Sequence, residues 1–373
     1  MVLAMHMGNE LLSIPMAVVT LALAGLLVGA AALRARKTLS AEKLPLMGVM
    51  GAFVFAGQMI NFTLPGMPGT SGHLVGGVLL AIVLGPAAAI VTLTAILVVQ
   101  CFLFQDGGLL ALGCNILNMG VLPCVLGWGL YRLALGAAER AKAWRQYAAT
   151  WLACVAGVTA GAALVPVEAS FSGVLRIPTV QFLGVMVGVH LLIGFIEGLI
   201  TFVVVAYLRE IRPEALGLTP AAAGAGGVRT GAGKLSRGAV AASFLVTAAL
   251  LAGVIAWFAS GSPGGLEWSL LEHRYGTGEK AAGEGSSAAS GADTWQAKWS
   301  LLPDYGKRSA PLGEAPAGAK GVQEPSEGGA SAVKGWTSLA GMIGTAVTLG
   351  IVYLAGAILR RRGSIVGENG RQG

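Results

Sequence analysis

Four histidines are the side chains of this 373-residue chain best suited to bind a metal ion: His6, His73, His190 and His273. His6 follows Met5, and a Met-His pair at a free N-terminus is a chelator. The α-amine, the His6 amide nitrogen and His6 Nδ1 can close fused rings around one ion. A second imidazole, from His73, would complete a square of four nitrogens, which is typical of Ni(II) or Cu(II) rather than Zn(II). From these residues alone, a structural role for isolated histidines stays the commoner alternative.

The composition places the chain in a lipid bilayer. Hydrophobic residues make up 55% of the sequence and charged residues 12%, and the mean hydropathy of +0.72 is too high for an ordinary soluble domain. The formal net charge is +7, but the basic residues lie in short clusters beside apolar stretches, so we expect no nucleic-acid partner. No CxxC pair occurs, and the cysteines are interpreted as buried thiols: Cys101, Cys114, Cys124 and Cys154.

Nine apolar stretches are candidates for membrane-embedded helices. They lie near residues 13–34, 45–62, 72–84, 86–104, 109–134, 147–167, 181–208, 238–260 and 336–359. The pair Gly85-Pro86 separates the third stretch from the fourth. Because no basic segment precedes the first stretch, it is interpreted as a retained membrane helix rather than a secretory signal.

Basic clusters set the expected orientation of these helices. Four clusters, near residues 34–43, 132–145, 209–237 and 360–362, belong on the inside. The first two share one side only if an even number of spans separates them, which requires the split at Gly85-Pro86. We therefore predict an external N-terminus and a cytoplasmic C-terminus in the cell (inner or cytoplasmic) membrane. His6 and His73 then both lie at the external face.

The length of the third stretch predicts the surroundings of His73. A helix of roughly 13 residues rises only about 20 Å and cannot cross a hydrocarbon core of about 30 Å. Such a helix has to begin inside a cavity that is open to water. His73, at the start of this stretch, is therefore predicted to lie in a hydrated external vestibule.

Two polar stretches divide the chain. Residues 211–237 are rich in Gly and Ala and are predicted to be a flexible cytoplasmic linker. The linker joins a seven-span domain at 5–210 to a two-span module at 238–360. The external loop of that module, 261–335, is rich in Gly, Ser and Ala. The predicted fold class is an all-α integral membrane protein.

Several motifs are spread over roughly residues 5–210 in a specific order. They are Met5-His6-Met7, Thr70-Ser71-Gly72-His73, Gln105-Asp106-Gly107-Gly108, the run from Gly113 to Gly120, and the run from His190 to Gly198. This set closely resembles the substrate-specific membrane component of the nickel/cobalt energy-coupling-factor transporters. The resemblance implies a seven-helix substrate-binding domain that captures Ni²⁺ or Co²⁺ at its external face. It also implies that the ion ligands are Met5, His6 and His73.

The start of the chain departs from the family pattern. The chelate needs a free amine on Met5, yet Met1 to Ala4 stand before it. Because Met5 can itself serve as an initiator, we expect translation to begin there or the four residues to be trimmed. Otherwise the site differs from that of the family.

Polar residues near the turn between the fourth and fifth spans are candidates for orienting the ligands. Asp106 and Asn115 flank this turn, and Asn118 is a third candidate. Hydrogen bonding to a ligand imidazole is one interpretation, and helix capping by Asp106 is an equally weighted alternative. His190 and Glu197, two turns apart on one helix face, are interpreted as structural.

The two-span module carries a second resemblance. Pro263-Gly264-Gly265-Leu266-Glu267 and Leu302-Pro303-Asp304-Tyr305-Gly306 look like motifs of the small auxiliary subunit of the same transporters, here fused to the main domain. Gly264 stands where the family has an acid, so this position lacks the side chain that a metal-loading role would use. The implied function of the module is to help ion entry or to stabilise the loaded site. Glu272 and His273 could form a loose external ligand pair, with a solvated loop as the commoner alternative.

The expected function is that of the substrate-specific subunit of an ATP-driven importer, with the ion as cargo and no cofactor. The chain has no GxxxxGK[ST] phosphate-binding loop and is not expected to be an enzyme. The resemblance implies a transmembrane coupling subunit and two cytoplasmic ATPase subunits as partners. The alternative is an ATP-independent secondary transporter or channel for another solute, which predicts paired mid-membrane carboxylates that the sequence does not show. The family also imports cobalt for cobalamin synthesis. The choice between nickel and cobalt therefore stays open.

Overall fold

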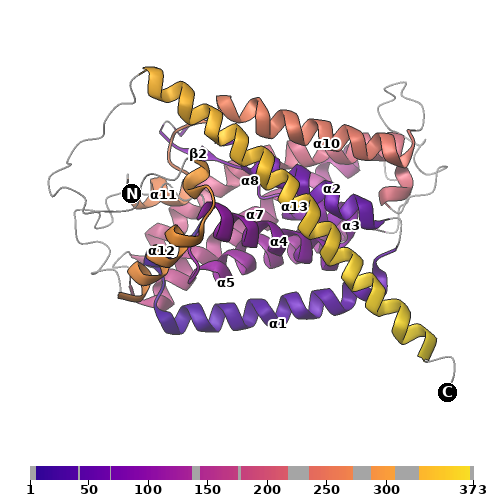
Figure 1. Cartoon of the computed structure of the whole chain (residues 1–373), viewed down its shortest axis with the longest axis horizontal. Coiled ribbons are helices and arrows are strands. Elements are labelled where there is room, and N and C mark those ends of the chain that lie inside the picture. The colour runs from indigo at the N-terminus through magenta and orange to yellow at the C-terminus, as the bar shows by residue number, and fades with distance from the viewer. Residues whose placement is uncertain are drawn as a thin grey trace.

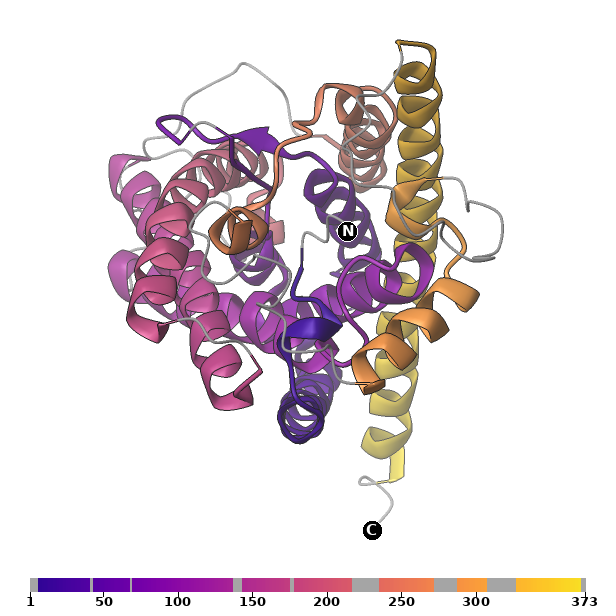
Figure 2. The same cartoon turned by 90° about the vertical axis from the view of Figure 1, so that its left-hand side faces the viewer.

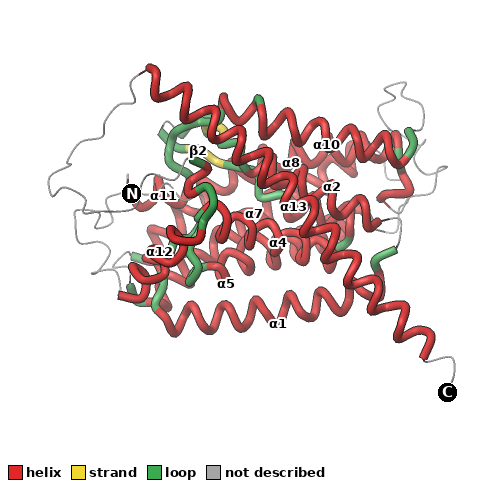
Figure 3. Tube along the Cα trace, viewed as in Figure 1, coloured by secondary structure: helices red, strands yellow, loops and turns green. Residues whose placement is uncertain are grey.

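The computed structural model describes residues 6–40, 43–67, 69–136, 143–174, 178–216, 235–271, 287–306 and 327–369. Most of its helices run along one long axis, and their connections gather at two opposite ends (Figures 1 and 3). The view along this axis shows the helices arranged around one another, with α13 (Glu327–Asn369) at the edge (Figure 2).

The other described elements are helices and two short strands. In chain order they are η1 (Asn9–Leu11), α1 (Ile14–Thr38), α2 (Lys43–Gln58), β1 (Phe62–Thr63), β2 (Ser71–Gly72), α3 (Gly77–Leu84), α4 (Pro86–Phe104), α5 (Leu112–Asn115), η2 (Ile116–Val121), η3 (Pro123–Gly127), α6 (Trp128–Leu135), α7 (Ala143–Ser172), α8 (Thr179–Ile211), η4 (Pro213–Leu216), α10 (Arg237–Gly253), η5 (Ile255–Phe258), α11 (Gly265–Leu271), α12 (Ser287–Trp299) and η6 (Pro303–Tyr305).

Seven helical segments of the described chain are long and apolar enough to cross a membrane. They are α1, α4, the continuous run from α5 to α6, α7, α8, α10 with η5, and the apolar part of α13. The other two predicted stretches also form helices, but α2 has 16 residues and α3 has 8. An all-α fold is the outcome expected for apolar segments in lipid, because a helix satisfies its own backbone hydrogen bonds. The predicted fold class is therefore confirmed.

The third stretch differs from the prediction at its start. A helix was expected from residue 72, but α3 begins at Gly77. β2 instead pairs antiparallel with β1. The helix is preceded by Gly76 at a φ of +78°, a left-handed conformation that glycine adopts readily. The prediction was wrong because backbone N–H groups before Gly77 bond to a side chain of α8, described below, rather than within a helix.

The fifth span is an irregular helix. Between α5 and α6 the chain passes through two π-helical stretches, η2 and η3, and the residues at their junctions keep right-handed helical φ and ψ angles. Helix α7 packs closely against this region: a Cβ added at Gly161 would lie 2.0 Å from the carbonyl oxygen of Asn118. Only glycine fits at this contact.

The two-span module is docked on the main domain. Both α10 and α13 pack against α2. Phe53 of α2 meets Phe244 of α10 edge to face, with ring centroids 5.3 Å apart. A Cβ on Gly344 of α13 would lie 2.1 Å from the ring of Phe55, so the two helices approach closely at this point. The module thus shares the main hydrophobic core.

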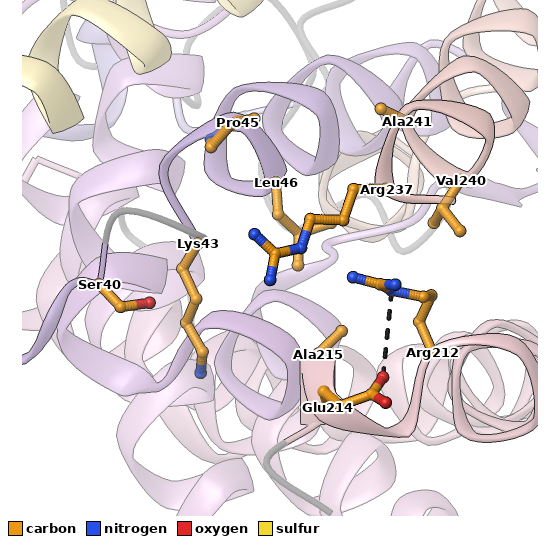
Figure 4. A pocket seen from close by; sticks show the side chains of 10 residues that line it. All are labelled: Ser40, Lys43, Pro45, Leu46, Arg212, Glu214, Ala215, Arg237, Val240 and Ala241. Atoms are coloured by element: carbon orange, nitrogen blue, oxygen red, sulfur yellow. Dashed lines mark ion pairs between the residues drawn. The ribbon is translucent and has the colours of Figure 1, made fainter. Parts of the chain in front are cut away.

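A basic pocket of about 200 Å³ lies at the end of the bundle where α1, α8 and α10 have their basic residues (Figure 4). Arg212 and Glu214, two residues apart in its wall, form an ion pair at 4.0 Å (Figure 4). The lining is Ser40, Lys43, Pro45, Leu46, Arg212, Glu214, Ala215, Arg237, Val240 and Ala241. Lys43, Arg212 and Arg237 come from three different segments of the chain. Positive charge at the ends of membrane helices is typical of the cytoplasmic side.

Candidate metal site

His6 lies at the opposite end of the bundle and is almost fully buried, with 3% of its surface exposed. The backbone beside it is held by Asn115 of α5. Asn115 Oδ1 accepts the Met7 N–H at 3.0 Å, and Asn115 Nδ2 donates to the Met7 carbonyl at 3.1 Å. Met7 and Leu11 also pack into a small hydrophobic cluster. His6 is therefore fixed in place although it belongs to no regular element.

Asp106, in the turn after α4, holds the His6 ring. His6 Nδ1 lies 2.8 Å from Asp106 Oδ1, and Asp106 Oδ2 accepts the Tyr305 hydroxyl at 2.6 Å. Burial alone would raise the pKa of the Asp106 carboxyl. The electrostatic attraction of His6 and the hydrogen bonds from His6 and Tyr305 outweigh burial, so this pKa lies below its usual value. The carboxylate is therefore ionised and His6 Nδ1 is the donor.

The loop that carries His73 is held by Glu197 of α8. The Glu197 carboxylate, 1% exposed, accepts the Val75 N–H at 2.7 Å and the Gly76 N–H at 3.1 Å. These bonds use the Val75 and Gly76 N–H groups outside a helix and delay the start of α3. His73 Nδ1 lies 3.0 Å from the Leu74 carbonyl oxygen, so it donates this bond and leaves Nε2 as the ring acceptor.

The two histidines meet at a cavity of about 70 Å³. The His6 and His73 rings lie edge to face, with centroids 5.4 Å apart. His6 Nε2 is buried and has no hydrogen-bond partner among the described residues. His190 of α8 lines the same cavity, and its Nδ1 is tied to the Met186 carbonyl at 2.8 Å. Three imidazoles therefore face one small space.

Asn118 was a candidate for orienting a ligand, and it lines this cavity from η2. Its Nδ2 donates to Glu168 Oε2 of α7 at 2.7 Å, while its Oδ1 is buried without a partner among the described residues. Glu168 was missed by the sequence reasoning. The available signal was a carboxylate inside an apolar span, which is costly in lipid unless it has a partner.

Of the two interpretations of Asp106, its side chain makes the hydrogen bond to an imidazole, whereas Asn115 bonds the backbone beside His6. Met5 and His273 lie outside the described residues. In the part of the chain that is described, no group of three or more His, Cys, Asp or Glu side chains is arranged to hold a metal ion.

The ring atom engaged by Asp106 is the one expected to bind the ion. A fused chelate with the His6 amide nitrogen requires Nδ1, and Nδ1 is bonded to Asp106 in the structure. As the ring lies, His6 offers Nε2. To offer Nδ1, the ring has to leave Asp106.

Apolar helices that cross the bilayer, with imidazoles gathered at a small cavity near one end, define a membrane transport component for a transition-metal ion. The chain belongs to the family described as cobalt uptake substrate-specific transmembrane region, which it matches over residues 6–215. Residues 238–361 match the PDGLE domain.

Proteins similar to this chain are named as metal transport proteins. A protein of Haloquadratum walsbyi named as a metal transport protein is 37% identical over 187 residues, which cover 50% of this chain and 82% of that protein. The fused nickel transport protein NikMN of Rhodobacter capsulatus is 33% identical over 193 residues, which cover 48% of this chain and 54% of that protein. The match thus spans about half the length of this fused relative. A crystal structure of a truncated transition metal transporter is 30% identical, with a TM-score of 0.47 over 54% of this chain and 97% of that chain.

Proposed function

We propose that this chain is the substrate-specific membrane subunit of an ATP-driven importer of Ni²⁺ or Co²⁺, and that Met5, His6 and His73 bind the ion. The observation that carries this proposal is the meeting of His6 and His73 over one cavity, with His6 Nε2 buried and without a partner among the described residues. A buried lone pair without a donor is unfavourable unless a ligand occupies it. The name of the fused nickel relative and the cobalt-uptake family support the choice of metals.

Nitrogen ligands suit these two ions. Imidazole binds Ni²⁺ and Co²⁺ well, and a square of nitrogens favours Ni²⁺. Two imidazoles, with His6 binding through Nε2, leave further positions around the ion, and the Met5 amine would fill one of them. We expect Asp106 to orient His6, and Asn115 to hold the segment that carries it.

Transport requires energy from partner proteins. The sequence has no GxxxxGK[ST] loop, so ATP hydrolysis falls to two cytoplasmic ATPase subunits joined through a transmembrane coupling subunit. The basic pocket supports a cytoplasmic location for its end of the bundle, and His6 and His73 would then lie at the external face. The loop at 61–73 would close over the captured ion, and the whole subunit would then reorient.

Metal binding to purified protein tests the ligand set. Chains that begin at Met1 and at Met5 are compared, each with and without His73→Ala, by titration with Ni²⁺ and Co²⁺. We expect the Met5 form to bind one ion tightly, and His73→Ala to weaken it by at least about 100-fold, the effect of losing a direct ligand rather than an outer-shell partner. Equal binding by the Met1 form, or no effect of His73→Ala, would contradict this ligand set.

The energy source is tested by uptake into vesicles. We expect accumulation of the ion only when the coupling and ATPase subunits are present with ATP. Accumulation by this chain alone would instead identify an ATP-independent transporter.

A further inference from the structure

The described backbone has three non-glycine residues with positive φ, and all three lie where the module meets the metal site. They are Gln105 at +57°, Asp304 at +51° and Tyr305 at +57°. A left-handed conformation costs an ordinary L-residue roughly 1–2 kcal/mol. Such residues persist only where the surrounding contacts hold them, and they cluster at functional sites. This junction is therefore built to place particular side chains.

The turn that contains η6 is fastened to the end of α4. The N–H groups of Leu301 and Leu302 both donate to the Leu103 carbonyl, at 2.9 and 3.0 Å. The Tyr305 ring stacks on Phe104, with centroids 4.8 Å apart and an angle of 16° between the planes. These contacts fix the position of the Tyr305 hydroxyl.

The hydroxyl completes a buried chain of hydrogen bonds that ends on His6. Tyr305 donates to Asp106 Oδ2 at 2.6 Å, and Asp106 Oδ1 accepts from His6 Nδ1 at 2.8 Å. Tyr305 and Asp106 are 9% and 5% exposed. Because Tyr305 holds one carboxylate oxygen, the other oxygen is held at a fixed place and angle. That oxygen determines which way the imidazole faces.

We propose that Tyr305, a residue of the fused module, is a positioning residue for the metal site and acts on His6 through Asp106. This inference rests on the proposed function. Outer-shell partners that orient a metal-binding histidine typically change metal affinity by about 10- to 100-fold when they are lost. The module therefore contributes directly to the geometry of the ion site.

The module is also attached to the site by contacts that do not involve Tyr305. Gln296 Nε2 donates to the Gly107 carbonyl at 3.0 Å, and Asn9 Nδ2 donates to Gln296 Oε1 at 2.7 Å. The Ser71 N–H donates to the Pro263 carbonyl at 2.8 Å. Removing only the Tyr305 hydroxyl should therefore leave the module docked.

The test uses the full chain with a Met5 start and the variant Tyr305→Phe, which keeps the ring that stacks on Phe104. We expect its affinity for Ni²⁺ to fall about 10-fold, the lower end of the outer-shell range, and the ligand-field absorption band of bound Ni²⁺ to shift. The matched control is Tyr207→Phe. It removes another tyrosine hydroxyl bond between the main domain and the module, from Tyr207 to Ser243 at 3.2 Å, remote from the site.

A double-mutant comparison separates positioning from general stability. If Tyr305 acts through Asp106, then Tyr305→Phe should add no further loss of affinity to Asp106→Asn. Unchanged affinity and spectrum in Tyr305→Phe, or equal changes in Tyr207→Phe, would overturn the proposal. So would tighter binding, because it would mean that the Asp106 bond competes with the ion for His6 Nδ1.

The two proposals can fail separately. If His73→Ala leaves Ni²⁺ binding unchanged, the ligand set itself is wrong. If His73→Ala weakens binding while Tyr305→Phe does not, the ligand set stands and only the role of Tyr305 is wrong.

Discussion

The two ends of the helical bundle are built from different chemistry. At one end, buried imidazoles, carboxylates and amides are tied together by short hydrogen bonds, such as His6 to Asp106 at 2.8 Å. At the other end, cations line a larger pocket, and the ion pair between Arg212 and Glu214 spans 4.0 Å (Figure 4). The Glu214 side chain is 44% exposed.

The difference shows where the chain needs accurate geometry. A metal ion is bound only if its ligands stand within a few tenths of an ångström of the right places. Positive charge at a membrane surface acts over a Debye length and tolerates loose positions. Substitutions at the histidine end should therefore have larger effects than matched substitutions at the basic end.

The largest expected effect comes from Gly161→Ala. Its new Cβ would lie 2.0 Å from the Asn118 carbonyl oxygen, whereas Gly129→Ala on α6 meets open space. We expect Gly161→Ala to lower the free energy of unfolding by about 1–3 kcal/mol or more, because the added methyl group overpacks this contact. Gly129→Ala should leave the free energy of unfolding unchanged or raise it by up to about 1 kcal/mol, because alanine favours a helix more than glycine does. Thermal unfolding in detergent measures both, and equal midpoints would contradict the close contact between α7 and η2.

The next effect comes from Glu197→Gln. Glutamine has one acceptor oxygen where the Glu197 carboxyl uses two, so either the Val75 or the Gly76 N–H loses its partner, and a buried donor left unpaired costs about 1–3 kcal/mol. If the loop of His73 loosens by this amount, ion affinity should fall about 10-fold or more.

The control for this variant is Glu214→Gln at the basic end. A half-exposed pair typically contributes no more than about 1 kcal/mol, so ion affinity should not change. Equal losses in the two variants would show that Glu197 has no special part in holding the loop.

The smallest effect concerns pH and the module residue Glu267. Burial raises the pKa of this carboxyl above its ordinary 4.5, and a backbone hydrogen bond at Gly264 offsets only part of the rise. The folded protein therefore binds this proton more tightly than the unfolded chain does. The resulting stability is fully present below pH 4.5 and is lost as the pH rises through the raised pKa.

Thermal unfolding across this pH range measures the effect. We expect the midpoint of the natural chain to fall relative to that of Glu267→Gln as the pH rises from about 4.5 towards neutrality. Parallel curves for the two proteins would mean that Glu267 titrates normally in the folded chain.

The amino-acid sequence by itself determined the membrane helices. Apolar stretches of helical length have to satisfy their backbone within one segment, so their positions follow from composition along the chain. Each of the nine predicted stretches forms a helix, including the pair separated at Gly85-Pro86. The motifs around His6 and His73 also indicated the family without any coordinates.

Only the tertiary structure decided how these residues meet. The late start of α3 depends on Glu197, which lies 122 residues from Val75. The orientation of His6 depends on Asp106 and then on Tyr305, 199 residues further along. Helical periodicity carries information about neighbours three or four residues away. Contacts between distant segments are set by how the helices pack, because a buried polar group takes whichever partner the packing brings within hydrogen-bond distance.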